Sequence, residues 1–275
     1  MKSNTDERTV ESFGDEWQRF DQSAVPAEES RAMFGRYFSR FPWDGLPEGA
    51  EGFDMGCGSG RWARWVAPRV GTLHCIDPSS ALDVARRNLA AFPNVRFHQG
   101  GVDDEVLPPG SQDFGYSLGV LHHVPDTAAA LRACTALLKP GAPFQLYLYY
   151  AFDNRTAMFR LVWRLSELVR RVVSAMPPGL KHLTADVLAV GVYFPLARGA
   201  ALLEKLGMRV SGIPLSFYRD KSFYTMRTDS RDRFGTPLEQ RFSRSEIEAM
   251  MRDAGLVDIE FSDTEPYWCA VGRKK

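Results

Sequence analysis

The sequence lacks an excess of charge of either sign. Its 275 residues contain 34 Lys and Arg against 34 Asp and Glu, so the formal net charge is zero with neutral histidines. A chain without net positive charge has no general attraction for a polyanion. The balance argues against a protein that binds nucleic acid without regard to sequence, and it favours a small molecule as the partner.

Cysteine is also scarce. Cys57, Cys75, Cys134 and Cys269 are widely scattered and form no C-x-x-C pair, so neither a zinc site nor a disulfide framework is indicated, and we predict no metal site. We interpret the four as small buried residues of a protein in a reduced compartment. The start MKSNTDERTVESFGDEW lacks the apolar core of a signal peptide. We therefore expect a cytoplasmic protein.

Long uninterrupted apolar runs are absent. In MFRLVWRLSELVRRVVSA, one helical face carries Arg160, Arg164, Glu167 and Arg171 while leucines line another. The run VLAVGVYFPLA is too short to cross a bilayer and contains Pro195. We therefore predict no integral membrane segment. A basic amphipathic helix can lie on a membrane surface or hold a lipid-like substrate, which leaves surface association open. A lid packed by its apolar side is our preferred interpretation.

Short apolar runs alternate with helical stretches between residues 50 and 150. EGFDM, TLHCID, NVRFHQ, DFGYSLGV and APFQLYLYY read as strands, and helices of ordinary length separate most of them. This alternation implies βαβ units and hence a parallel sheet. After a long interruption the pattern resumes with a helix that begins at a capping box, Ser243 and Glu246, and with two final strands.

The alternation divides the chain into three parts. Residues 1–48 form an N-terminal helical lid, in which aromatic side chains recur at steps of three and four. Residues 49–150 and 233–275 form the α/β domain. Residues 151–232 form a helical insertion, which is too long for a simple loop.

A strand that ends in a glycine-rich turn is the most informative stretch. FDMGCGSGR passes from a strand through Gly56, Gly58 and Gly60 directly into a helix, so the backbone can approach a ligand closely at a helix N-terminus. Arg61 stands where the dinucleotide fingerprint G-x-G-x-x-G has its third glycine, which disfavours NAD. The next strand ends in Asp77, 21 positions after Gly56 (77 − 56), where a carboxylate can accept both ribose hydroxyls. These features favour a ligand with a ribose but no pyrophosphate.

Four ordered segments, FDMGCGSGRWA, CIDPSS, YSLGVLHHVPD and LLKPGAPFQLYLYY, resemble signature segments of the class I S-adenosylmethionine (SAM)-dependent methyltransferases. The resemblance covers about residues 50–150 and resumes at 240–272. It implies an α/β fold with a Rossmann-like, seven-stranded, mostly parallel sheet whose last strand is antiparallel. Helices flank this sheet, and the helical insertion follows strand five. The implied cofactor is SAM, bound at the carboxyl ends of the strands.

The same resemblance assigns residues to the SAM site. Asp54 and the glycines surround the methionine part, Asp77 faces the ribose, and Leu118 and Gly119 lie beneath the cofactor. The full set of expected cofactor-binding residues is Trp17, Asp54, Gly56, Cys57, Gly58, Gly60, Asp77, Pro78, Gly101, Val102, Asp103, Leu118 and Gly119.

The segment expected at the adenine departs from the usual pattern of the family. Gly101 stands where an acidic residue is usual. Either Asp103 reaches the adenine amino group instead, or the backbone amide of Val102 carries recognition alone.

Three residues are candidates for catalysis: His123, Asn154 and Tyr218. Methyl transfer is an in-line displacement, and an enzyme accelerates it mainly by positioning the two reactants. A general base is needed only if the acceptor must lose a proton. His123 follows strand four and could be that base. Asn154 lies where strand five enters the insertion, and Tyr218 belongs to a polar, aromatic cluster before the fold resumes. For these residues, and for Trp17, a structural role is the alternative.

The leading hypothesis is transfer of a methyl group from SAM to a small-molecule acceptor. One alternative consumes SAM without methyl transfer, because it cyclises the aminocarboxypropyl chain to a product of the azetidine-2-carboxylate type and releases methylthioadenosine. Another is a SAM-binding protein without catalysis. The acceptor and the oligomeric state stay open.

Overall fold

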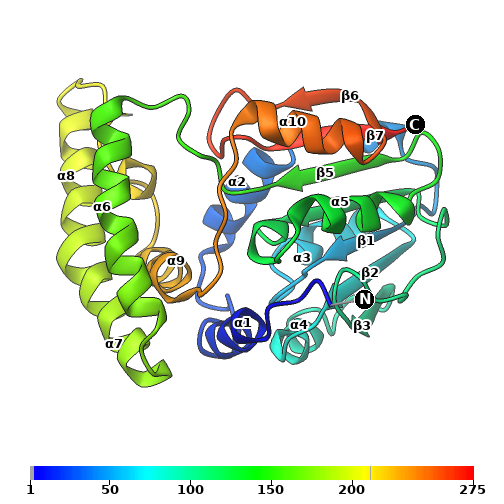
Figure 1. The fold of residues 1–275 in the computed structure, drawn as a ribbon, viewed down its shortest axis with the longest axis horizontal. Helices are drawn as coiled ribbons and strands as arrows, with labels where there is room; N and C mark the ends of the chain where they lie inside the picture. The colour runs from blue at the N-terminus through cyan, green and yellow to red at the C-terminus, as the bar shows by residue number, and fades with distance from the viewer. Residues whose placement is uncertain (1–2, 211) are drawn as a thin grey trace. The chain divides into compact units, whose positions relative to one another are not determined.

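The computed structural model describes residues 3–210 and 212–275 and divides the chain into two compact units (Figure 1). The first unit comprises the chain up to Gln22 together with Ser30–Ala151 and Leu238–Lys275. The second comprises Ser23–Glu29 and Phe152–Pro237. The chain therefore leaves the first unit after Ala151 and re-enters it at Leu238.

The first unit contains one seven-stranded sheet, which confirms the predicted fold class. The strand order is β3-β2-β1-β4-β5-β7-β6. Neighbouring strands from β3 to β5 are parallel, whereas β7 is antiparallel to both β5 and β6. The order changes direction between β1 and β4, which is where parallel α/β sheets open a crevice for ligands. The strands are β1 (Glu51–Met55), β2 (Thr72–Asp77), β3 (Val95–Gln99), β4 (Phe114–Leu118), β5 (Pro143–Tyr147), β6 (Leu256–Phe261) and β7 (Ala270–Lys274).

Three helices, α1, α5 and α10, begin at a short polar side chain that caps them. Asp6 accepts from Thr9 N at 2.9 Å, Asp126 accepts from Ala129 N, and Ser243 forms the expected capping box with Glu246. The helices and 3-10 turns outside residues 152–237 are α1 (Glu7–Arg19), α2 (Ala27–Tyr37), η1 (Trp43–Gly45), α3 (Ala63–Val66), η2 (Ala67–Arg69), α4 (Ala81–Asn88), η3 (Leu121–His123), α5 (Thr127–Ala136) and α10 (Arg244–Asp253).

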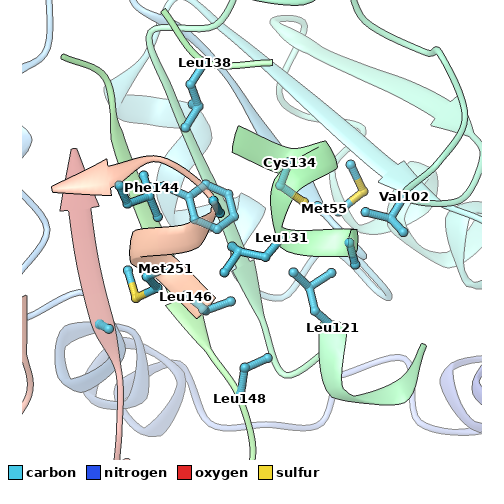
Figure 2. Packing of buried hydrophobic residues seen from close by; sticks show 14 of the residues in the cluster. Met55, Val102, Leu121, Leu131, Cys134, Leu138, Phe144, Leu146, Leu148 and Met251 are labelled. Atoms are coloured by element: carbon cyan, nitrogen blue, oxygen red, sulfur yellow. The ribbon is translucent and has the colours of Figure 1, made fainter. Parts of the chain in front are cut away.

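Two cores form because successive strand residues point to opposite faces of the sheet. Phe144 and Leu146 pack on one face against Leu131 of α5 and Met251 of α10 (Figure 2). The other face packs against α2, α3 and α4, where Leu82 belongs to the second cluster. All four cysteines are buried and free, as the sequence predicted.

The second unit is helical. Its core joins Val173, Tyr193, Ala197, Met226 and Phe234, and α9 lies against both α6 and α7. Its elements are α6 (Ala157–Ser174), α7 (Pro178–Leu188), the π-helical segment η4 (Ala189–Tyr193), α8 (Phe194–Lys205), the 3-10 turn η5 (Ser216–Tyr218) and α9 (Phe223–Gly235).

The run VLAVGVYFPLA is part of a longer helical segment than its own length suggested. It lies inside one continuous helical segment, Pro178–Lys205, of 28 residues. Pro195 does not break it because the proline falls in the first turn of α8, directly after the π-helical segment. Among the described residues this is the one helix that is long and apolar enough to cross a membrane, by length and composition only.

Candidate functional site

The loop between β1 and α3 can be built only from glycines at its key positions. Gly56, Gly58 and Gly60 have φ values of +78°, +53° and +78°, a region that L side chains rarely adopt. A Cβ on Gly56 would lie 2.4 Å from Cγ1 of Val120, which follows β4. The loop therefore packs tightly on the loop after β4, and a side chain at Gly56 has no room.

Asp77 ties the end of β2 to this glycine loop. Its Oδ2 accepts from Gly58 N at 2.9 Å, and its Oδ1 accepts from both the amide and the hydroxyl of Ser79, at 2.8 and 2.6 Å. Burial raises the pKa of Asp77, and the hydrogen bonds from Ser79 and Gly58 oppose that rise. Since a carboxylate oxygen can accept two hydrogen bonds, Oδ2 keeps capacity for a hydroxyl of a ligand.

Asp54, near the end of β1, is a buried carboxyl group. Its Oδ2 has no hydrogen-bond partner among the described residues. Burial raises the pKa of Asp54 to about 8, and the nearby Asp77 adds to the rise, while Tyr116 and Arg61 oppose it. A buried carboxyl with this pKa is prepared to ionise when a cation arrives next to it.

The loop after β3 carries two acidic side chains, Asp103 and Asp104, directly beside Gly101. Asp104 Oδ2 accepts from Gly101 N at 2.7 Å, whereas Asp103 Oδ2 accepts from the backbone of Asn4 at 2.9 Å. Val102 is buried. Both sequence alternatives for the adenine, the Asp103 carboxylate and the Val102 amide, therefore stay predictions.

The loop after β4 holds Gly119 and two histidines. Gly119 has φ +79°, and a Cβ there would meet nothing within 4 Å, so the space beside it is open. His123 Nδ1 lies 2.7 Å from Leu238 O. A carbonyl can only accept, so Nδ1 must carry the proton, and Nε2 of the neutral ring is the acceptor.

His122 is enclosed. Both of its ring nitrogens lack a hydrogen-bond partner within the described ranges, and its ring centroid lies 3.9 Å from that of Tyr149. Burial lowers the pKa of His122 well below its ordinary value, and the charges of His123 and Arg241 lower it further. His122 is therefore neutral near pH 7.

Helix α1 passes over the ends of the strands. Gly14 approaches Ser80 after β2, because a Cβ on Gly14 would lie 2.6 Å from Ser80 Oγ. Trp17 approaches the glycine loop, with its Nε1 3.1 Å from the Cβ position of Gly58, and Phe13 lies edge-on to His123 at 4.9 Å. One short helix thus contacts the loops after β1, β2 and β4.

Two of the expected catalytic residues belong to the helical unit. Asn154 is exposed in the turn before α6. Tyr218 packs next to Tyr193, with ring centroids 5.2 Å apart, and burial raises its pKa well above the ordinary value. Tyr218 therefore stays protonated and can donate a hydrogen bond. Of the three candidates, the structure places only His123 in the same unit as the glycine loop.

Several residues at this site were not found from the sequence. Ser79 fixes Asp77 through the hydrogen bonds from its amide and its hydroxyl. Gln240 donates from its amide nitrogen to Val124 O at 2.7 Å, and Arg241 stacks on Tyr149 with its guanidinium 5.0 Å from the ring centroid. The serine two residues after an aspartate was a usable signal for the first. Nothing in the local sequence marks the other two, because tertiary folding brings their segment to the loops after β4 and β5.

The arrangement fits SAM. A glycine-only cradle suits close backbone contact, Asp77 retains acceptor capacity for a ribose, and the orphan carboxyl of Asp54 suits the cationic methionine end. When bound, SAM supplies an electrophilic methyl group. The residues that would hold it are Asp54, Asp77 and the backbone of the glycine loop.

Known proteins with similar sequences are methyltransferases. The pattern of the methyltransferase domain family matches residues 53–141. The ubiquinone biosynthesis O-methyltransferase of Xanthomonas euvesicatoria is 31% identical over 188 residues, which cover 66% of this chain and 73% of that protein. Its counterpart in Xanthomonas axonopodis is 31% identical over 190 residues, with coverage of 66% and 74%.

Solved structures agree on the fold. An O-methyltransferase family protein from Burkholderia thailandensis superposes with a TM-score of 0.55 at 16% identity, over 94% of this chain and 59% of that chain. A methyltransferase-like protein from Bacillus halodurans gives 0.52 at 14% identity, over 84% and 72%. At such identities the likeness shows the fold alone.

Fold, glycine cradle and curated relatives together define the class of enzyme. The chain belongs to the class I SAM-dependent methyltransferases. It is an enzyme that uses SAM, as the sequence predicted.

Proposed function

We propose that this enzyme transfers the methyl group of SAM to a hydroxyl oxygen of a small-molecule acceptor. The observation that carries the proposal is the identity of the curated relatives, which are O-methyltransferases that this chain matches over nearly three quarters of their length. A zero net charge supports a small acceptor rather than a nucleic acid.

The loop after β4 supports oxygen as the accepting atom. A hydroxyl must lose its proton to become an effective nucleophile, so a general base contributes more for oxygen than for an uncharged amine. His123 offers such a base, since its Nδ1–H is held by Leu238 O and Nε2 is left to accept. Phe13 and Tyr149 surround the two histidines with aromatic faces, which suits a flat, phenol-like acceptor.

We further propose that two segments act as lids. Helix α1 supports this role through its contacts with the loops after β1, β2 and β4. We propose the helical insertion, 151–232, as the second lid because of its length and helical character, with Asn154 and the protonated Tyr218 as candidate hydrogen-bonding groups for the acceptor. Closing such lids excludes water from the reacting groups.

Matched acceptors test which atom is methylated. Purified protein receives SAM with a deuterated methyl group and either a catechol or the corresponding arylamine. The proposal predicts label on the catechol oxygen and little on the amine, as read by mass spectrometry and NMR of the product. Label that appears only on nitrogen or on ring carbon would replace the oxygen assignment.

A further inference from the structure

The exposed apolar surface of this protein is concentrated on one hairpin of helices. Seventeen of the nineteen large hydrophobic side chains that are exposed among the described residues lie between Met158 and Met208, and the other two are Phe223 and Val257. Of the seventeen, all but Leu206 and Met208 belong to α6 and to the continuous segment α7–η4–α8, which run alongside one another (Figure 1). Leu206 and Met208 follow directly after α8. Soluble proteins rarely leave a concentration of this kind without a partner.

Helical spacing makes this surface a continuous stripe on each helix. On α6, Leu161, Leu165, Leu168 and Val172 follow steps of four, three and four. The opposite side of α6 is already used, because Val173 is buried in the core of the unit. The exposed stripe is therefore surplus to the packing of the unit. We call it, with the matching stripe of Leu183, Val187 and Val190 on α7–η4, the apolar hairpin face.

Charges border this face without interrupting it. Arg160, Arg164 and Arg171 are exposed on α6, whereas Glu167, the acid of that helix, is half-buried and paired with Arg170 at 2.6 Å. Along α7, Asp186 is half-buried and held by Arg227 at 2.8 Å. The exposed charge on α6 is therefore entirely positive.

We propose that the apolar hairpin face lies on the surface of a membrane that contains anionic phospholipid. Apolar side chains bordered by arginines match a bilayer whose hydrocarbon boundary lies beneath negative headgroups. A second copy of the same face fits less well, since it would bring the arginine rows of two α6 helices together. This proposal stands independently of the oxygen-transfer proposal.

The segment lies on the membrane rather than crossing it. At 1.5 Å per residue it is long enough for the ~30 Å hydrocarbon layer. However, Tyr193 and Ala197 are buried in the core of the unit, and Asp186 on the same segment is paired with Arg227 of α9. A crossing segment would lose this packing and carry that carboxylate into hydrocarbon.

Vesicle co-sedimentation of the full chain tests the proposal. The protein is mixed with phosphatidylcholine vesicles and with vesicles that also contain phosphatidylglycerol. We expect binding to the second kind that weakens as salt increases. Replacing Leu165, Leu183 and Val187 together by Gln should weaken that binding more than about a hundredfold. Arg160→Glu with Arg164→Glu should weaken it roughly tenfold and remove the preference for phosphatidylglycerol.

Two controls separate the proposal from its competitors. Val257→Gln changes an exposed hydrophobic residue on β6, which belongs to the first unit, and should leave vesicle binding unchanged. SAM affinity and melting temperature of the triple variant should match the parent protein, because the three side chains are exposed. Absence of binding to both vesicles would overturn the proposal. So would a dimer in light scattering that the triple variant converts to monomer, because the face would then join two copies.

Discussion

Two buried carboxylates at adjacent strand ends have different surroundings, and this difference assigns them different tasks. Asp77 receives three hydrogen bonds from Gly58 and Ser79, so it is a fixed acceptor. Asp54 has an unsatisfied Oδ2 and a pKa of about 8. The first suits a neutral ribose, and the second suits a cation that changes its ionisation.

Removing the fixed acceptor should weaken SAM binding. In Asp77→Ala the ribose loses a charged acceptor and the glycine loop loses its tie to β2. We expect the dissociation constant to rise roughly 10- to 100-fold, since a hydrogen bond to a charged group contributes about 1.5–3 kcal/mol. Isothermal titration calorimetry measures it. Asp83→Ala, on the exposed surface of α4, is the control, and equal affinities for the two variants would remove Asp77 from the SAM site.

Asp54 should make SAM binding depend on pH. Its folded-state pKa of about 8 exceeds the ordinary value of 3.8, so the ligand-free protein holds a proton between these pH values that the unfolded chain does not. Stability of the ligand-free protein therefore falls as pH rises from about 4 to about 8. A bound cation favours the ionised form, so SAM affinity should rise over the upper part of this window with release of a proton.

Calorimetry in buffers of different ionisation enthalpy counts that proton. Asp54→Asn should abolish both the proton release and the fall of ligand-free stability with pH, as followed by thermal melting at several pH values. The assignment of the titration to Asp54 fails if the variant releases the same proton as the parent protein.

His123 should affect turnover rather than binding. Glutamine retains a donor for Leu238 O but cannot accept a proton at neutral pH. We expect His123→Gln to lower kcat by roughly 10²- to 10⁴-fold with unchanged SAM affinity. His98→Gln, at the far strand β3, is the matched control. A parallel loss of SAM affinity would instead make His123 a packing residue of the loop.

At the scale of elements, small and large residues alternate between β1 and β4. Gly115 lies opposite Phe53, and Gly52 lies opposite Phe114. A Cβ on Gly115 would lie 2.4 Å from the Phe53 ring. The sheet can pack its two phenyl rings across these strands only because glycine faces each of them.

Gly115→Ala should therefore destabilise the protein. Overpacking a buried site costs about 1–3 kcal/mol, which denaturant unfolding measures. Gly179→Ala, in the first turn of α7 with nothing within 4 Å of the new Cβ, should be neutral or stabilising by up to about 1 kcal/mol. Equal unfolding free energies for the two variants would show that β1 and β4 relax around the extra methyl group.

The elements that could be predicted from the sequence have strong local signals. The strands of the sheet alternate with helices, and the helix after the insertion begins at Ser243 with its capping box. The continuous helix through Pro195 could not be predicted, because its π-helical turn is stabilised by tertiary packing of Tyr193 and Ala197. Around Pro68 the chain forms only the short helix α3 and the 3-10 turn η2, since proline has no amide hydrogen to donate to a helical hydrogen bond.

At the scale of the whole molecule, neutrality of net charge conceals an uneven distribution. The chain as a whole carries no excess charge, yet the exposed charges of α6 are all arginines next to an apolar stripe. Composition identified the class of partner for the glycine loop but could not locate this surface. Its detection required knowing which leucines the helical core leaves outside.

The candidate SAM loops could be predicted because they are short segments at strand ends, where topology alone brings them together. The contributions of Gln240 and Arg241 could not be predicted. Gln240 reaches the loop after β4 from 116 residues away, and Arg241 reaches Tyr149 after β5 from a similarly distant part of the chain.

Mass spectrometry of the nucleoside product tests the central claim, methyl transfer from SAM, most directly. Purified protein is incubated with SAM alone and with SAM plus a catechol. We predict S-adenosylhomocysteine and methylated catechol in equal amounts, both lost in Asp77→Ala. Methylthioadenosine formed from SAM alone, with a cyclic amino acid as its companion product, would contradict methyl transfer and make SAM the sole substrate.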